Sequence, residues 1–231
     1  MHQNIDNNQL LANFHAVKSA LQAANDAAHR SHPCGLLAVS KTKPAAMIRA
    51  LVQAGQVDFG ENYLQEAMAK MDELNDLPIV WHYIGSIQRN KTRDIAKHFD
   101  WVHTVSREVI ATRLNEQRAG LPPLNVLIQV NIDDEDSKSG CTPDEVPALI
   151  ACIQACENLS LRGLMVIPSK DGSDAFVRTK ALFDEMAERF ELAAWDSISM
   201  GMSGDMADAV AHGSTMVRLG TAIFGERDYS Q

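Results

Sequence analysis

The chain has 231 residues, of which 45% are hydrophobic, and its formal charge of −9 comes from 30 acidic side chains against 21 Lys plus Arg. This composition supports one large folded domain and excludes an intrinsically disordered chain. The negative balance argues against nucleic acid or an anionic membrane as the main partner. No apolar run approaches the roughly 20 residues that span a bilayer, and residues 1–8 lack the apolar core of a secretion signal.

The cysteines do not form a metal-binding pattern. Cys152 and Cys156 lie four residues apart, but neither they nor Cys34 and Cys141 have a histidine or a second cysteine pair at zinc spacing. We therefore expect reduced thiols, no metal site and a cytoplasmic protein.

The first predicted element is an amphipathic helix over residues 5–28, in which Leu11, Phe14, Val17 and Leu21 recur at spacings of three and four. A break at 32–35 separates it from a short buried strand at 36–39. Pro44 suits the first position of the following helix.

Seven more short apolar strands follow, and a helical pattern comes after each of them. Ser106 is expected to cap one of these helices, Thr142 and Glu145 to form a capping box, and Ser203 to begin a helix that ends at Gly213. The predicted strands cover residues 57–60, 79–84, 101–105, 125–130, 161–167, 197–200 and 216–219.

Strands and helices thus alternate about eight times, which predicts a parallel sheet. Eight repeats in just over 200 residues fit a single (β/α)8 TIM barrel, an α/β fold, spanning residues 1–231 with an extra N-terminal helix. A doubly wound open sheet is the alternative, although residues 40–44 are not the Gly-rich turn that it needs.

Lys41 follows the first strand directly, at the end of a barrel where functional residues are found. Apolar surroundings lower the proton affinity of a lysine, and its neutral amine can form a Schiff base with an aldehyde. The alternative is a solvated lysine at the start of a helix.

The loops after the last two strands predict a phosphate site. Ser203 and Gly204 follow the seventh strand, and Gly220 and Thr221 follow the eighth. Small residues and hydroxyls at helix starts leave backbone N–H groups available to an anion, and barrels bind phosphate at these two loops.

Arg218 lies on the eighth strand, where a side chain pointing into the barrel needs a partner. One interpretation is an ion pair with Asp58 or Glu61. The other is a hydrogen bond to the ring nitrogen of an aromatic cofactor, where the fixed positive charge would disfavour protonation of that nitrogen.

Several motifs stand in order from about residue 36 to Tyr229. They are AVSKTKP at 38–44, FGENY at 59–63, WHYIG at 81–85, SKSG at 137–140, GMS at 201–203 and VRLGTAIFG at 217–225. Together they resemble the pyridoxal phosphate homeostasis protein family, whose barrel is similar to the N-terminal domain of alanine racemase. The resemblance implies a fold-type III barrel for pyridoxal 5′-phosphate (PLP). Ile87 and Gly204 depart from the usual family pattern without touching the predicted chemistry.

The resemblance also assigns residues. It implies that Lys41 forms the Schiff base and that Arg218 faces the ring nitrogen. Lys138 matches a family lysine that handles the cofactor in transit, for which the alternative is an exposed loop lysine. The implied phosphate contacts are Ser203, Gly220 and Thr221, and Asn62, His82 and Met165 are expected to line the ring.

Racemases of this fold carry a second domain that supplies a tyrosine acid/base, and this chain ends at Gln231, directly after the predicted barrel. We therefore expect a monomeric, non-catalytic PLP carrier that buffers the cofactor or delivers it to PLP-dependent apo-enzymes. The alternatives are a fold-type III racemase or decarboxylase, or a phosphate-sugar enzyme with Lys41 as an aldolase-type lysine.

Overall fold

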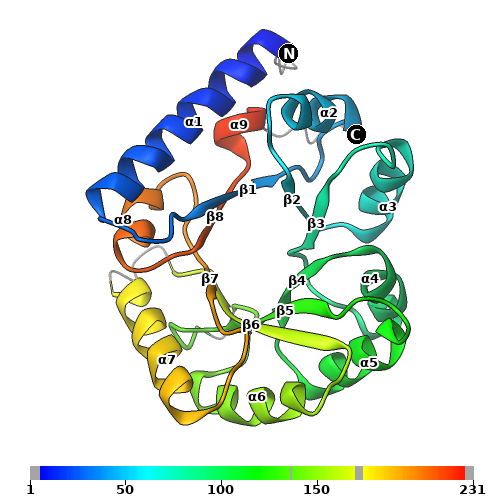
Figure 1. Ribbon diagram of the computed structural model, residues 1–231, viewed down its shortest axis with the longest axis vertical. Helices are drawn as coiled ribbons and strands as arrows, with labels where there is room; N and C mark the ends of the chain where they lie inside the picture. Colours follow the sequence, from blue (N-terminus) through cyan, green and yellow to red (C-terminus); the bar gives the residue numbers. More distant parts are fainter. Residues whose placement is uncertain (1–5, 136, 170–173, 227–231) are drawn as a thin grey trace.

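The chain forms a closed barrel of eight parallel strands, which follow one another around the ring in chain order (Figure 1). This computed structural model describes residues 6–135, 137–169 and 174–226. Residue 136 in the polar loop and residue 229, where the family resemblance ends, lie outside these ranges. The strands are β1 Gly35–Val39, β2 Asp58–Glu61, β3 Val80–Tyr83, β4 Trp101–Val105, β5 Leu124–Val130, β6 Leu159–Val166, β7 Ser197–Ser199 and β8 Met216–Leu219.

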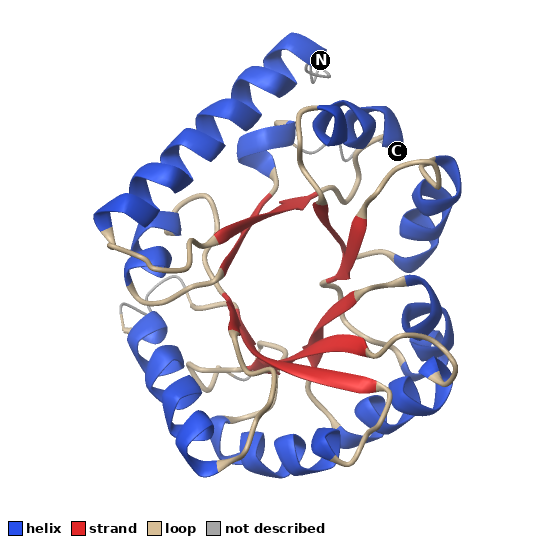
Figure 2. Cartoon of the chain, viewed as in Figure 1, coloured by secondary structure: helices blue, strands red, loops and turns tan. Residues whose placement is uncertain are grey.

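Helices surround the strands, so the predicted TIM barrel is confirmed (Figure 2). The helix bounds are α1 Asn7–Ala27, α2 Ala45–Gln53, α3 Leu64–Glu73, α4 Thr92–His98, α5 Glu108–Arg118, α6 Val146–Gln154, α7 Ala175–Arg189, α8 Met206–Ala211 and α9 Thr221–Phe224, with 3-10 turns η1 Arg89–Lys91 and η2 Pro143–Glu145.

The extra N-terminal helix α1 packs against α2, α8 and α9, next to the seam where the barrel closes. Its buried face presents Phe14, Val17 and Leu21, as the spacing of three and four residues predicts. Leu10 is fully buried, whereas the predicted Leu11 is only partly buried. The Asn13 side chain donates a 3.1 Å hydrogen bond to the carbonyl of Ile223 in α9. The helix therefore ties the beginning of the chain to its last element.

The strands have two different faces. The outer face packs on the helices and forms one continuous hydrophobic core, whereas Leu37, Leu127 and Met165 are buried apart from that core. Because side chains alternate along a strand, these three residues mark the barrel interior. The interior also holds polar side chains, among them His103 and Arg218.

Pairing of β1 with β8 closes the barrel, with Leu37 opposite Arg218 and Ala38 opposite Leu219. This register places the loop after β1 beside the loop after β8, although the two loops lie at opposite ends of the sequence. The predicted lysine and half of the predicted phosphate site are thereby brought together.

Three predicted helix starts are wrong. Pro44 is the residue before α2 rather than its first, and α5 begins at Glu108 after Arg107, so Ser106 is not its cap. Helix α8 begins at Met206, three residues after Ser203, because the Asp205 carboxylate accepts the N–H of Met202 and closes a turn first. The Thr142–Glu145 capping box is confirmed.

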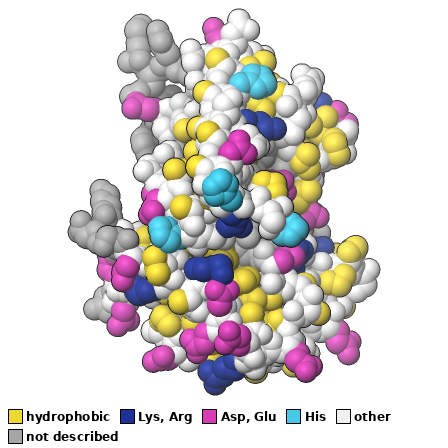
Figure 3. Space-filling view, turned by 60° about the vertical axis from the view of Figure 1, so that its left-hand side comes forward, with side chains coloured by type: hydrophobic (Ala, Val, Ile, Leu, Met, Phe, Trp, Pro, Cys, Tyr) yellow, Lys and Arg dark blue, Asp and Glu magenta, His cyan; other side chains and the backbone are white. Residues whose placement is uncertain are grey.

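On the side of the molecule drawn in Figure 3, basic, acidic and histidine side chains are interspersed with small apolar areas. Within the described ranges, no helix is both long and apolar enough to cross a bilayer.

Candidate functional site

Lys41 lies in the turn that follows β1, and its side chain is half-buried. It lines a small cavity together with residues from the loop after β8; the lining residues are Val39, Lys41, Lys43, Gly220, Thr221 and Gly225. The lysine and the Gly220–Thr221 pair, predicted from separate motifs, therefore share one cavity.

The backbone next to this lysine is strained. Thr42 has φ of 63°, a left-handed conformation that is rare for a β-branched residue. Its N–H donates to the Glu66 carboxylate at 2.6 Å. A strained conformation of this kind persists only where surrounding contacts hold it, and such positions are concentrated at functional sites.

Ser40, Glu61, Glu66 and Lys70 form what we call the outer ion cluster, between the barrel wall and α3. The Lys70 ammonium contacts the Glu61 carboxylate at 2.7 Å and the Glu66 carboxylate at 2.5 Å. It also donates to the Ser40 carbonyl at 2.8 Å, and the Ser40 hydroxyl donates to Glu61 at 2.6 Å. The residues on both sides of Lys41 are therefore fixed to one buried cluster.

Burial raises the pKa of the Glu61 carboxyl above its usual range, although the Lys70 ammonium and the Ser40 hydroxyl act in the opposite direction. Glu61 is fully buried and Lys70 is 6% exposed. A buried carboxylate needs such partners, because an unpaired charge in the interior costs several kcal/mol.

Gly220 precedes α9 and stands against β1. A Cβ atom added at this position would lie 3.2 Å from the Val39 carbonyl oxygen, closer than most such contacts. The absence of a side chain therefore keeps the cavity wall open and leaves the backbone here accessible to a bound group.

Ser203 lies in an exposed turn on the neighbouring loop. The start of that loop runs beside β8, since Arg218 donates its backbone N–H to the Gly201 carbonyl at 3.0 Å. Gly201 has φ of 93°, and a Cβ there would lie 2.5 Å from the Ala209 side chain. Glycine is thus required where the chain turns from β7 toward α8.

Arg218 points into the barrel, but its partners are not the predicted acids. Nη1 donates to the Ser199 carbonyl at 2.7 Å and to its hydroxyl at 2.9 Å, and Nη2 donates to the Val166 carbonyl at 2.9 Å. Backbone carbonyls at the ends of β6 and β7 therefore satisfy the guanidinium. Burial lowers its pKa to about 10, so it remains a cation at neutral pH.

Two histidines extend this contact across the barrel interior. The Ser199 hydroxyl lies 3.1 Å from His103 Nδ1, His103 Nε2 lies 2.9 Å from His82 Nδ1, and His82 Nε2 lies 3.0 Å from an Asp58 carboxylate oxygen. We call Asp58, His82, His103, Ser199 and Arg218 the inner hydrogen-bond chain. Both ring nitrogens of His82 are engaged within it.

The two other predicted ring contacts lie on a barrel strand and directly after one. Met165 is buried on β6, and Asn62 follows β2 directly and is half-buried. The Asn62 Oδ1 atom is itself buried, and among the described residues it has no hydrogen-bond partner. An acceptor without a donor is uncommon in a folded protein and fits a ligand that brings a hydroxyl or N–H group.

The described residues contain no cluster of three or more His, Cys, Asp or Glu side chains that could hold a metal ion. All four cysteines are free thiols, as expected.

Known proteins match nearly the whole chain. The family model described as "Alanine racemase, N-terminal domain" matches residues 5–228. The pyridoxal phosphate homeostasis protein of Pseudomonas aeruginosa is 52% identical over 224 residues, 94% of this chain and 95% of its own. That of Escherichia coli K12 is 48% identical over 234 residues, 97% of this chain and 99% of its own. This chain belongs to the pyridoxal phosphate homeostasis protein family.

A solved structure with similar fold and length is that of PipY from Synechococcus elongatus PCC7942 with PLP bound. It is 33% identical, with a TM-score of 0.81, and covers 94% of this chain and 100% of PipY. An alanine racemase of Clostridium difficile 630 has a TM-score of 0.71 at 15% identity, covering 96% of this chain and 58% of the racemase. The second likeness concerns the fold alone.

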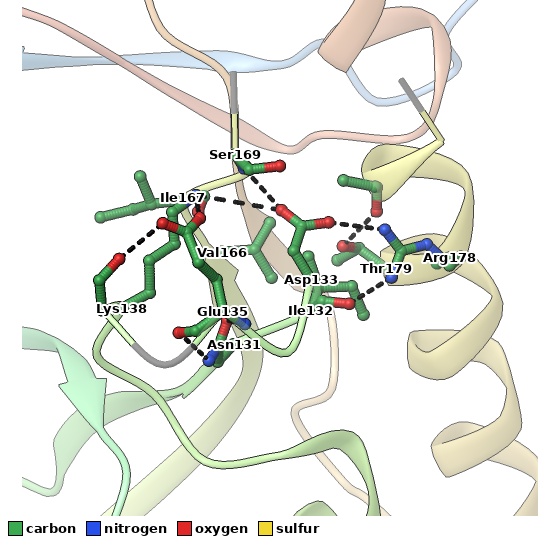
Figure 4. A network of polar contacts seen from close by, with 12 residues as sticks. Asn131, Ile132, Asp133, Glu135, Lys138, Val166, Ile167, Ser169, Arg178 and Thr179 are labelled. Carbon is green, nitrogen blue, oxygen red and sulfur yellow. Dashed lines mark hydrogen bonds and ion pairs between the residues drawn. The ribbon is translucent and has the colours of Figure 1, made fainter. Parts of the chain in front are cut away.

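Lys138, matched to a lysine of the pyridoxal phosphate homeostasis protein family, lies in a polar loop at the end of β5 (Figure 4). Its ammonium donates to the Ile167 carbonyl at 3.1 Å and lies 3.4 Å from Glu135 and 4.0 Å from Asp133. Asp133 is held in turn by Arg178 at 2.6 Å. Lys138 is therefore a half-buried, partnered lysine rather than a freely solvated one.

Sequence reasoning missed the residues that support the site. His103 and Ser199 lie on the inward faces of β4 and β7, which are not neighbours in the barrel. Their contact therefore depends on closure of the barrel. Lys70 carried a usable signal, because it falls on the buried face of α3, where a lysine needs an acidic partner.

Proposed function

We propose that this protein holds PLP covalently on Lys41 and buffers it or delivers it to PLP-dependent apo-enzymes. The observation that carries the proposal is the cavity that Lys41 shares with Gly220 and Thr221, in a chain about half identical to pyridoxal phosphate homeostasis proteins. When bound, the cofactor supplies an aldehyde that condenses reversibly with a lysine amine as a Schiff base.

The residues of the site fit the parts of PLP. Backbone and hydroxyl groups of Ser203, Gly220 and Thr221 would hold the phosphate, since small loops that precede helices favour anions. Arg218 would face the ring nitrogen as a cation. The unpartnered Oδ1 of Asn62 suits a ring hydroxyl, and His82 and Met165 would line the ring from inside the barrel.

The role of Lys41 depends on its loop. The outer ion cluster holds Ser40 and Thr42 on either side of it, so the backbone of Lys41 has a fixed place at the barrel end. A pre-positioned loop loses less conformational freedom when the cofactor binds.

We propose a carrier rather than an enzyme, acting as a single-domain monomer in the cytoplasm. The names of the relatives, which are homeostasis proteins, support this over the racemase or decarboxylase alternative. Lys138, whose ammonium is held beside Glu135 and the Ile167 carbonyl in the loop after β5, is proposed to handle the cofactor in transit.

The test is to mix the purified protein with PLP, record the absorption spectrum, reduce with borohydride and map the adduct by mass spectrometry. We expect a band near the visible edge and an adduct on Lys41, both lost in Lys41→Ala. The matched control is Lys97→Ala, which removes an exposed lysine of α4 outside the site.

An adduct that maps to another lysine would overturn the assignment of Lys41. A second assay measures racemisation of alanine and serine by the loaded protein. Enzyme-like turnover there would overturn the carrier role and favour a fold-type III enzyme.

A further inference from the structure

The polar groups inside the barrel form a continuous line between two charges. It begins at the Arg218 guanidinium, passes through the Ser199 hydroxyl and the His103 and His82 rings, and ends at the Asp58 carboxylate. Every contact in it lies between 2.9 and 3.1 Å. The Arg218, Ser199, His103 and His82 side chains are buried, whereas the Asp58 side chain is 42% exposed.

The two ends of this line fix the direction of its hydrogen bonds. A guanidinium only donates, so the Ser199 oxygen accepts from Arg218 and can donate its own proton to His103 Nδ1. A carboxylate only accepts, so His82 Nε2 carries a proton and donates it to Asp58. Between the rings, a single proton then lies on His103 Nε2 and points to His82 Nδ1.

Both rings are neutral in this arrangement. Burial lowers the pKa of His82, against the opposing effects of Asp58 and Asp100. Burial also lowers the pKa of His103 well below its usual range, and His82 and Arg218 act in the same direction. Burial lowers the pKa of Arg218, and the Asp205 carboxylate opposes this effect. Neutral rings carry one proton each, which is what a chain of one direction requires.

Packing holds the rings in the orientation that the chain needs. The His82 ring stacks on Trp101 with centroids 5.4 Å apart and an angle of 13° between the planes. His103 meets His82 edge-on, at 5.1 Å and 75°. These contacts hold the planes of the two rings, and the hydrogen bonds at both nitrogens of each ring fix which way each ring is turned.

We propose that Asp58, His82, His103 and Ser199 are positioning residues. They form a chain in which every hydrogen bond is donated in the direction from Arg218 to Asp58, and this chain holds the Arg218 guanidinium in place for the ring nitrogen of PLP. The inference rests on the proposed function for the role of Arg218. Asp58 lies at the amino-terminal end of β2, four contacts from the guanidinium, and acts through the residues between them. The Asp58 carboxylate keeps the His82 proton on Nε2, so His82 Nδ1 accepts the proton of His103 Nε2. His103 Nδ1 then carries no proton and accepts from the Ser199 hydroxyl.

The first test measures where the protons lie in the inner hydrogen-bond chain when no PLP is present. In protein labelled with 15N at histidine, NMR at pH 7.5 should show His82 and His103 as neutral rings, each protonated at Nε2 and not at Nδ1. Asp58→Ala removes the terminal acceptor and should shift both rings toward mixed tautomers. Asp58→Asn retains an acceptor oxygen and should restore the wild-type signals in large part. Because Asp58 is part-exposed, neither change should prevent folding.

The second test reads PLP binding to the same variants. Asp58→Ala should weaken the affinity for PLP about threefold to tenfold and shift the absorption band of the bound cofactor, and Asp58→Asn should recover most of both. Thr104→Val is the control, because it removes a buried hydroxyl from β4 on the opposite face, where Thr104 donates to the Gly85 carbonyl. It should leave the tautomers and the band unchanged.

A proton on Nδ1 of either wild-type histidine would overturn the inference. So would an Asp58→Ala variant whose tautomers, affinity and band all equal those of the wild type. If instead the wild type shows the expected tautomers but takes up no PLP on Lys41, the proposed function fails and the direction of the chain stands.

Discussion

Strand β2 contributes an acid to each of two buried polar groups, one on either side of the barrel wall. Glu61 faces α3 and belongs to the outer ion cluster, where two carboxylates share the ammonium of Lys70. Asp58 faces the barrel interior and ends the inner hydrogen-bond chain, where two neutral rings separate it from Arg218. Ion pairs stabilise the outer ion cluster, whereas hydrogen bonds between neutral rings, each with its proton on a defined nitrogen, stabilise the inner hydrogen-bond chain.

This difference decides how each group fails. Removing the Lys70 ammonium from the outer ion cluster leaves the buried Glu61 carboxylate without a cation, so the fold itself should become less stable. A change in the inner hydrogen-bond chain can alter proton positions while the barrel remains folded. The outer ion cluster holds the loop of Lys41, and the inner hydrogen-bond chain is proposed to hold Arg218. The two ends of the proposed cofactor site are therefore stabilised by different interactions, ion pairs at one end and directed hydrogen bonds at the other.

The largest effect is expected from Lys70→Met. This change leaves the fully buried Glu61 carboxylate without its cation, and we expect the free energy of unfolding to fall by about 3–5 kcal/mol. Urea denaturation at pH 7.5 measures it. Combining Lys70→Met with Glu61→Gln should recover most of the loss. A loss below about 1 kcal/mol for Lys70→Met alone would show that the cluster is not held by charge.

The inner hydrogen-bond chain should instead make the free energy of unfolding depend on pH. Burial lowers the pKa of His82 and His103 in the folded protein, whereas imidazoles of the unfolded chain titrate near pH 6.5. Below about pH 6.5 the unfolded state therefore binds more protons, and the free energy of unfolding should fall as the pH falls. Each histidine contributes a slope of at most about 1.4 kcal/mol per pH unit.

Urea denaturation between pH 7.5 and 5 checks this slope. His103→Gln should reduce it, while His98→Gln, which changes an exposed histidine of α4, should leave it as in the wild type. An unchanged slope in His103→Gln would mean that His103 does not remain neutral in the folded protein.

A smaller effect is expected where the outer ion cluster meets the strained turn. Glu66→Ala removes the acceptor of the Thr42 N–H, and Thr42 has φ of 63°. We expect a loss of about 1 kcal/mol in unfolding free energy and a faster release of PLP. Adding Thr42→Gly should restore stability but not retention of PLP, because glycine relieves the strain without fixing the loop. If Glu66→Ala retained PLP as long as the wild type does, the conformation of this loop would not matter for the role of Lys41.

The sequence was sufficient for the barrel because each strand is a short apolar run followed by a helical pattern, and eight such units admit few arrangements. It located Lys41 and Gly220 at strand ends for the same reason. It failed at Ser106 and Ser203, where a residue suited to capping a helix precedes the actual start. In the second case the side chain of Asp205 forms a turn that competes with the helix.

The partners of Arg218 could not be predicted from the sequence. The sequence left open an ion pair with an acid or a contact with the ring nitrogen of a cofactor, and it did not indicate the carbonyls of Val166 and Ser199 that hold the guanidinium. These carbonyls belong to strands 52 and 19 residues away in the sequence. Only the strand register of the closed barrel brings these carbonyls to the guanidinium, and no local sequence pattern predicts that register.

The seam between β1 and β8 has a consequence for folding of the protein. Lys41 and the cavity wall opposite it, Gly220 to Gly225, are distant in the sequence and meet only where β8 pairs with β1. A chain whose barrel has not yet closed therefore carries the amine without the cavity that surrounds it. If Lys41 holds the cofactor as proposed, only the closed barrel offers a complete site, so partly folded chains would not compete for the vitamin.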